Sequence, residues 1–114
     1  MLFRSKDRVK RIGSCSDTGH WARRDLVPVE QMKKLEGRIE HLHFKDLNKF
    51  GGDAHYVPWG TGVSDAKGML TELKRQAYKG YMSIEYETGS VSDLEANLPL
   101  CVAFFDKTMT ELGK

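Results

Sequence analysis

The sequence has little cysteine, little net charge and no long apolar run, and each shortage argues against a class of protein. Its two cysteines, Cys15 and Cys101, lie far apart and in no metal-binding or redox spacing, so we expect both to be reduced and buried. Lys and Arg total 18 against 16 Asp and Glu, and this net charge of +2 is too small to indicate a nucleic-acid partner. The longest apolar stretch, residues 98–105, contains Pro99 and is too short to cross a membrane. Without the apolar stretch of a secretory signal near Met1, we expect a cytoplasmic protein.

The composition otherwise fits one small domain. The chain has 114 residues, of which 39% are hydrophobic and 30% charged, enough to bury a modest core. Residues 1–11 are rich in lysine and arginine, which predicts a solvated helix or tail. We therefore expect residues 1–114 to form a single α/β domain that starts with a basic segment.

Strand patterns alternate with helix patterns along the chain. The predicted strands cover residues 12–17, 39–47 and 81–87. The predicted helices cover residues 28–37, 65–79 and 94–112. Strands that alternate with helices in this way are typical of parallel βα units.

Local signals predict how some of these elements begin and end. Gly19 predicts a tight turn after the first strand. Ser92 and Glu95 form a capping-box pattern before the last helix. Pro99 lies inside that helix, so we expect a kink or a fresh start near Asn97.

The central strand has one polar and one apolar face. Alternate side chains of a strand point to opposite faces, which places Leu42 and Phe44 together. The other face then carries His41, His43 and Lys45. Because the apolar face packs on helices, the polar face lines a wet, charged or metal-binding site. A half-exposed edge strand would give the same pattern.

Metal-capable and acid–base side chains follow all three predicted strands. In parallel βα folds, functional groups gather where strands end and loops begin. In chain order these groups are Asp17 with His20, His43 with Lys45, and Glu85 with Glu87. Carboxylate and imidazole together suit a divalent ion such as Mn²⁺, Co²⁺, Zn²⁺ or Mg²⁺ with open positions for a substrate. Each group also has a plain structural interpretation, such as a turn cap for Asp17 or an ion pair between Glu85 and Lys45.

Four motifs carry a resemblance to a known family. They are residues 17–20 (DTGH), 41–46 (HLHFKD), 58–62 (PWGTG) and 84–87 (IEYE). In order, spacing and position they resemble the xylose-isomerase-like TIM barrels, the sugar and sugar-phosphate isomerases and epimerases. The resemblance runs from about residue 12 to the C-terminus. It implies a partial (β/α)8 barrel of about three C-terminal βα units, whereas a full barrel has eight strands and about 250 residues.

The resemblance also implies a reaction and a set of site residues. The family binds its divalent metal through a Glu, an Asp, a His and a second Glu, and the last three match Asp17, His43 and Glu85. His20 matches a histidine that contacts substrate, and Lys45 matches a further substrate contact. Glu85 is the implied proton-transfer residue, while the first metal-binding Glu has no counterpart in this sequence. The implied reaction moves a proton between neighbouring carbons of a metal-bound sugar.

Three strands of a barrel leave open sheet edges and an uncovered interior face. We therefore expect the chain to form a homo-oligomer that pairs partial barrels edge to edge. A truncated gene product or barrel fragment would have the same length. In that case the chain would be a catalytically inactive oligomer that keeps only a metal-binding or structural role.

A third function fits several of the same residues. Zinc phosphodiesterases of the related apurinic-endonuclease family would also recruit Asp53 and His55 from the long loop, residues 48–63. The near-neutral net charge and the Lys45-Asp46 pair favour the sugar enzymes. Asp53 and His55 are more simply interpreted as a polar loop tip.

Overall fold

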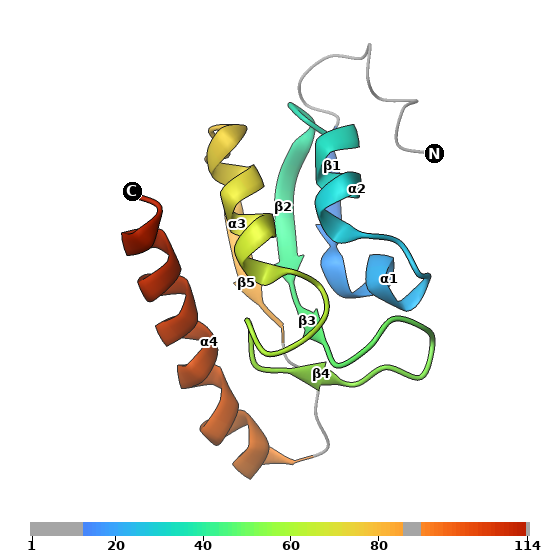
Figure 1. The fold of residues 1–114 in the computed structure, drawn as a ribbon, viewed down its shortest axis with the longest axis vertical. Coiled ribbons are helices and arrows are strands. Elements are labelled where there is room, and N and C mark those ends of the chain that lie inside the picture. Colours follow the sequence, from blue (N-terminus) through green and yellow to red (C-terminus); the bar gives the residue numbers. More distant parts are fainter. Residues whose placement is uncertain (1–12, 86–89, 114) are drawn as a thin grey trace.

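A parallel sheet of three strands lies at the centre of the structure (Figure 1). This computed structural model describes residues 13–85 and 90–113. The strands of the sheet are β1 (Ser14–Asp17), β2 (Ile39–Phe44) and β5 (Tyr81–Ile84). β2 lies between the other two, and the register pairs His43 with Asp17 of β1 and with Ser83 of β5. The carboxyl ends of the three strands therefore lie at the same edge of the sheet.

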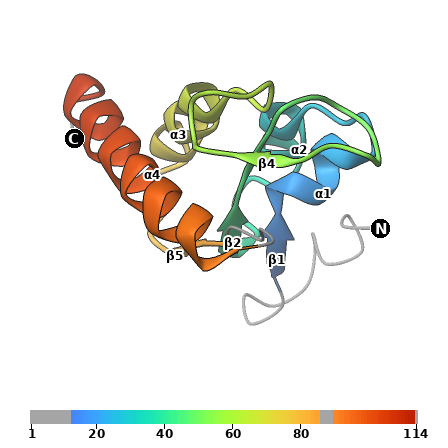
Figure 2. The same cartoon turned by 90° about the horizontal axis from the view of Figure 1, so that it is seen from below.

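Helices follow the strands. They are α1 (Thr18–Arg23), α2 (Pro28–Lys34), α3 (Ala66–Arg75) and α4 (Val91–Glu111). Figure 2 shows α1, α2 and α3 on the same side of the sheet and α4 beyond β5. Parallel strands that alternate with helices are the βα units that the sequence predicts, and they agree with the partial (β/α)8 barrel that the resemblance implies. None of the helices in the described part of the chain is long and apolar enough to cross a membrane.

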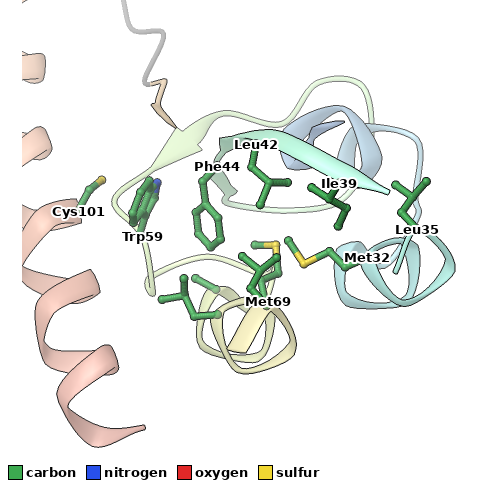
Figure 3. Close-up of a cluster of buried hydrophobic side chains, with 11 residues drawn as sticks. Met32, Leu35, Ile39, Leu42, Phe44, Trp59, Met69 and Cys101 are labelled. Atoms are coloured by element: carbon green, nitrogen blue, oxygen red, sulfur yellow. The ribbon is translucent and has the colours of Figure 1, made fainter. Parts of the chain in front are cut away.

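The apolar face of β2 packs against α2 and α3 and forms the core. Leu42 and Phe44 are fully buried, as their alternation with polar residues predicts. The other members of the cluster are Met32, Leu35, Ile39, Trp59, Ala66, Met69, Leu70, Leu73 and Cys101. Figure 3 shows Trp59 between Phe44 and Cys101, so this loop residue connects α4 to the core. Burial of side chains of this size contributes about 1.5–3 kcal/mol each, and this packing holds the polar strand ends in place.

The central strand is shorter than the predicted residues 39–47, because the chain changes direction at Lys45. Two short strands follow, β3 (Asp46–Leu47) and β4 (Tyr56–Val57). They pair antiparallel with each other, so the segment predicted as a loop contains a strand. The Thr18 hydroxyl accepts a hydrogen bond from the Lys45 N–H at 2.8 Å and donates one to the Lys45 carbonyl at 3.1 Å. The Thr18 side chain thus binds both the backbone N–H and the backbone carbonyl of Lys45, the residue that directly follows β2.

The region around β1 differs from the prediction in two ways. A short helix, α1, follows β1 in place of a simple turn, because the Asp17 carboxylate caps it by accepting the N–H groups of Gly19 and His20 at 2.9 and 3.2 Å. The prediction that Cys15 is buried is wrong. Cys15 is exposed, because it points to the face of β1 that lies opposite the helices, whereas Cys101 is buried as predicted.

The last helix begins earlier than predicted. Ser90 is its N-cap and accepts a hydrogen bond from the helix backbone at 3.1 Å, so the predicted capping box of Ser92 and Glu95 is wrong. Ser90 directly precedes the helix and has the extended backbone that an N-cap needs, whereas Ser92 already lies within the first turn of the helix. α4 then runs continuously through Pro99 and has no fresh start near Asn97.

Two predicted segments extend beyond the described residues. They are the basic segment, residues 1–11, and the end of the third predicted strand, including Glu87. Within the described part, β1 starts at Ser14 and β5 ends at Ile84, so both are shorter than predicted. Glu85 directly follows β5 at the edge of the sheet that carries the other predicted site residues.

Candidate metal centre

Asp17, His43 and Glu85 converge at the carboxyl ends of β1, β2 and β5. Each offers one metal-capable atom, and these three atoms lie within 4.8 Å of one another. His43 Nδ1 lies 3.9 Å from Asp17 Oδ2 and 3.4 Å from Glu85 Oε2. The side chains are 14% (Asp17), 35% (His43) and 39% (Glu85) exposed, so the group is open to solvent on one side. The structure thus brings together the three residues that the sequence proposes as metal ligands.

The orientation of Asp17 follows from its place at the start of α1. Its Oδ1 atom accepts the backbone N–H groups of Gly19 and His20. Its Oδ2 atom faces the centre, 3.9 Å from His43 Nδ1. The helix cap therefore uses one carboxylate oxygen and leaves the other directed toward His43.

His43 is flanked by a second histidine on the same face of β2. The rings of His41 and His43 form an edge-to-face pair with centroids 5.4 Å apart. His41 Nε2 and Ser83 Oγ are 2.8 Å apart, which links β2 to β5 beside the centre. His41 does not join the group of ligand atoms; its ring limits the orientations of His43.

Lys45 lies beside the two carboxylates and its side chain is only 2% exposed. Its Nζ atom is 2.9 Å from Asp17 Oδ2 and 2.6 Å from Glu85 Oε1. Tyr56 also contacts this ammonium, with its hydroxyl at 3.3 Å and its ring centroid at 4.9 Å. Glu85 therefore forms the ion pair with Lys45 that its plain structural interpretation predicts. The sequence does not single out Tyr56, because no motif marks this residue of β4.

His20 lies at the mouth of the centre. Its side chain is 70% exposed, and its Nε2 atom is 3.7 Å from Asp17 Oδ2. This position leaves the imidazole accessible to a molecule that approaches the three converging side chains. It is compatible with the substrate contact that the resemblance implies.

Asp53 and His55 do not join the centre. Among the described residues, the metal-capable group consists of Asp17, His43 and Glu85 alone. The Asp53 carboxylate instead accepts a hydrogen bond from Lys49 at 2.9 Å, and this contact lowers the pKa of Asp53. Both loop residues are exposed, in agreement with their interpretation as a polar loop tip.

The donor set fits a divalent cation. Two carboxylates and one imidazole are ligands shared by Mn²⁺, Co²⁺, Zn²⁺ and Mg²⁺ sites, and the solvent-facing side leaves room for substrate oxygens. The ammonium of Lys45 offsets one of the two carboxylate charges. The remaining negative charge still attracts a divalent ion.

Comparisons with known proteins agree with the fold of the chain. The family model described as xylose isomerase-like TIM barrel matches residues 2–107. No curated protein matches the chain. Among solved structures, a xylose isomerase domain protein from Planctomyces limnophilus has a TM-score of 0.84 at 19% identity, over 97% of this chain and 42% of that one. A D-tagatose 3-epimerase-like protein has a TM-score of 0.71 at 23% identity, also over 97% and 42% of the two chains.

A third solved structure is nearer in sequence and more distant in shape. An uncharacterized protein from Parabacteroides distasonis is 33% identical over 93% of this chain and 42% of that one, with a TM-score of 0.55. The chain thus spans less than half the length of each of these three structures. The likenesses below 25% identity establish the barrel fold, and the family model covers nearly the whole sequence. This chain belongs to the xylose isomerase-like TIM barrel family.

Proposed function

We propose that the chain is part of a divalent-metal-dependent isomerase or epimerase of sugars or sugar phosphates. The observation that carries the proposal is the convergence of Asp17 Oδ2, His43 Nδ1 and Glu85 Oε2 at one open edge of the sheet. Membership of the xylose isomerase-like family supports it, as does the likeness to a protein described as D-tagatose 3-epimerase-like.

The residues of the centre have distinct parts in this proposal. Asp17, His43 and Glu85 would hold the ion, which when bound polarises the carbonyl and hydroxyl oxygens of the sugar. Glu85 is 39% exposed at the solvent-facing side, where its carboxylate can take a proton from a sugar carbon and return it. His20, which is 70% exposed, would bind a sugar hydroxyl at the mouth. If the proton is delivered to the opposite face of the sugar, a second acid–base group is required. Asp17, His43 and Glu85 do not provide it.

Metal analysis and sugar conversion test the proposal together. We expect purified protein supplied with Mn²⁺ or Co²⁺ to retain one ion per chain and to interconvert a ketose or its phosphate. His43→Ala should abolish both, because it removes the only imidazole among the three converging ligands. His55→Ala is the matched control, since this exposed loop histidine lies outside the group.

Other outcomes would point to the alternatives. Bound metal without conversion of any sugar would support the alternative of a catalytically inactive chain that only binds metal. Cleavage of abasic-site DNA that Asp53→Asn reduces would support the phosphodiesterase function. Metal retained equally by His43→Ala would contradict the proposed centre itself.

We further propose that a second copy of the chain covers the open edge of the sheet next to β5. A cavity of about 490 Å³ lies between β5, α3 and α4, and a second of about 130 Å³ adjoins it; Met82 and Phe105 line both. Large apolar side chains nearby are exposed, including Tyr81 (83%) and Val102 (46%). Because the chain spans 42% of each of the three structures described above, two copies supply most of the length of one such chain.

Sedimentation velocity at micromolar concentration tests this association. We expect a dimer for the natural chain and a monomer for Tyr81→Lys, because a charged residue at an exposed sheet edge opposes pairing. Val63→Lys, at an exposed loop residue away from β5, should leave the dimer intact. A natural chain that sediments as a folded monomer would refute the proposal.

A further inference from the structure

We infer that Lys45 is an internal counter-ion: its ammonium holds Asp17 and Glu85 together when no metal is bound and weakens the binding of a divalent ion. This inference rests on the proposed function for the identity of the centre. It assigns Lys45 a role different from the substrate contact that the resemblance implies.

The burial of Lys45 argues against direct contact with a substrate. Its side chain is 2% exposed, whereas those of His43 and Glu85 at the same centre are 35% and 39% exposed. The ammonium lies between two carboxylate oxygens, at 2.9 Å from Asp17 and 2.6 Å from Glu85. A buried ammonium is stable only when it is paired, and these two contacts provide the pairing.

The surroundings of Lys45 hold its side chain in this direction. Thr18 binds both the N–H and the carbonyl of Lys45, which fixes the backbone where β2 ends. The stem of Lys45 packs on Gly19, where an added Cβ atom would lie 2.8 Å from the Lys45 Cδ atom. Tyr56 places its hydroxyl and the face of its ring against the ammonium. The start of α1 and the strand β4 thus pack around the Lys45 side chain and leave it only 2% exposed.

The two carboxylates divide their oxygens between Lys45 and the open side of the centre. Glu85 directs Oε1 to Lys45 and Oε2 to His43. Asp17 uses Oδ1 to cap α1, so its Oδ2 atom faces both Lys45 and His43. A metal ion bound by these atoms would share Asp17 Oδ2 with the ammonium and lie close to it. Like charges at such distances repel, so Lys45 lowers the affinity for the ion while it keeps its ligands in place.

The test is Lys45→Met, which keeps much of the length of the side chain and removes its charge. We expect calorimetric titration with Mn²⁺ alone to show an affinity at least about tenfold higher than that of the natural chain. In the presence of EDTA, the same variant should melt at a lower temperature, because the two carboxylates lose their shared partner. The double variant Lys45→Met with Glu85→Gln should recover part of that loss, because it removes one of the two unpaired charges.

Lys49→Met is the matched control. It removes one positive charge from an exposed lysine that pairs with Asp53 in the loop, away from the centre. Neither the Mn²⁺ affinity nor the EDTA melting temperature should change by a comparable amount.

Each outcome decides between the two roles of Lys45. Equal or weaker Mn²⁺ binding by Lys45→Met, or an unchanged melting temperature in EDTA, would overturn the inference. If Lys45→Met fails to fold and the double variant folds, the role of Lys45 as counter-ion to the two carboxylates is supported. If neither variant folds, Lys45 acts through packing and the inference is wrong. Absence of Mn²⁺ binding in both the natural chain and a folded Lys45→Met would also overturn it. A natural chain that converts no sugar, with Mn²⁺ affinity that still rises in Lys45→Met, would refute the isomerase function alone.

Discussion

Replacement of Asp46 by alanine is expected to destabilise the fold by about 4 kcal/mol or more. The Asp46 carboxylate is buried, with 1% of the residue exposed, and accepts hydrogen bonds from four backbone N–H groups. These donors belong to Leu47, Gly60, Gly62 and Ser64, at distances from 2.9 to 3.1 Å. A hydrogen bond to a charged group contributes about 1.5–3 kcal/mol, and a buried donor left without an acceptor adds a further cost.

The Asp46 contacts connect β3 to the loop that carries Trp59, so their loss reaches the core. Trp59 lies against Phe44 with ring centroids 4.5 Å apart, and the loop that positions it is held by Asp46. At Gly62 an added Cβ atom would collide with the Leu47 carbonyl and the Asp46 carboxylate, so the close approach of this loop requires glycine. A small domain is stable by only about 5–15 kcal/mol, and Asp46→Ala removes a large part of that.

Urea denaturation followed by circular dichroism measures this loss. Asp65→Asn is the control, because Asp65 is exposed and caps α3 by accepting one hydrogen bond from the Gly68 N–H at 3.0 Å. We expect it to cost about 1 kcal/mol or less. Asp46→Asn preserves the shape but turns an amide group toward one set of backbone donors, so it should resemble Asp46→Ala more than the control. Equal midpoints for Asp46→Ala and Asp65→Asn would show that the carboxylate does not hold the loop.

The parts of the fold that could be predicted from the sequence depend on short-range periodicity. Leu42 and Phe44 alternate with His41 and His43, and this alternation alone assigns the buried and polar faces of β2. The convergence of Asp17 with His43 then follows from parallel pairing, because parallel strands bring their carboxyl ends to one edge.

The parts that could not be predicted depend on contacts between distant residues. The end of β2 at Phe44 reflects the bonds between Thr18 and Lys45, which are 27 positions apart. Tyr56 reaches Lys45 only because β3 and β4 pair, and two-residue strands have no detectable period. Cys15 is predicted to be buried because its distance from Cys101 indicates neither a metal site nor a redox pair, but this spacing does not say which face of β1 it occupies, and Cys15 is exposed.

Replacement of Glu85 by glutamine is expected to reduce kcat for sugar conversion by about 10²–10⁴-fold at saturating Mn²⁺. The amide has the shape of the carboxylate but cannot take a proton from carbon. Glu85 Oε2 lies 3.4 Å from His43 Nδ1, so the amide oxygen can remain near the ion, and saturating Mn²⁺ separates weaker metal binding from lost proton transfer. The KM for the sugar should change much less than kcat, because the hydroxyl contacts proposed for His20 are retained.

Deuterium uptake from solvent gives the second measurement. Proton transfer through a solvent-open carboxylate exchanges the proton on the sugar carbon, so the natural chain should label its substrate in heavy water and Glu85→Gln should not. Glu36→Gln is the control. Glu36 is half exposed, follows α2 and pairs with Arg75 at the C-terminal end of α3. If Glu85→Gln retained natural turnover and labelling at saturating Mn²⁺, another group would have to move the proton, and Glu85 would be a metal ligand at most.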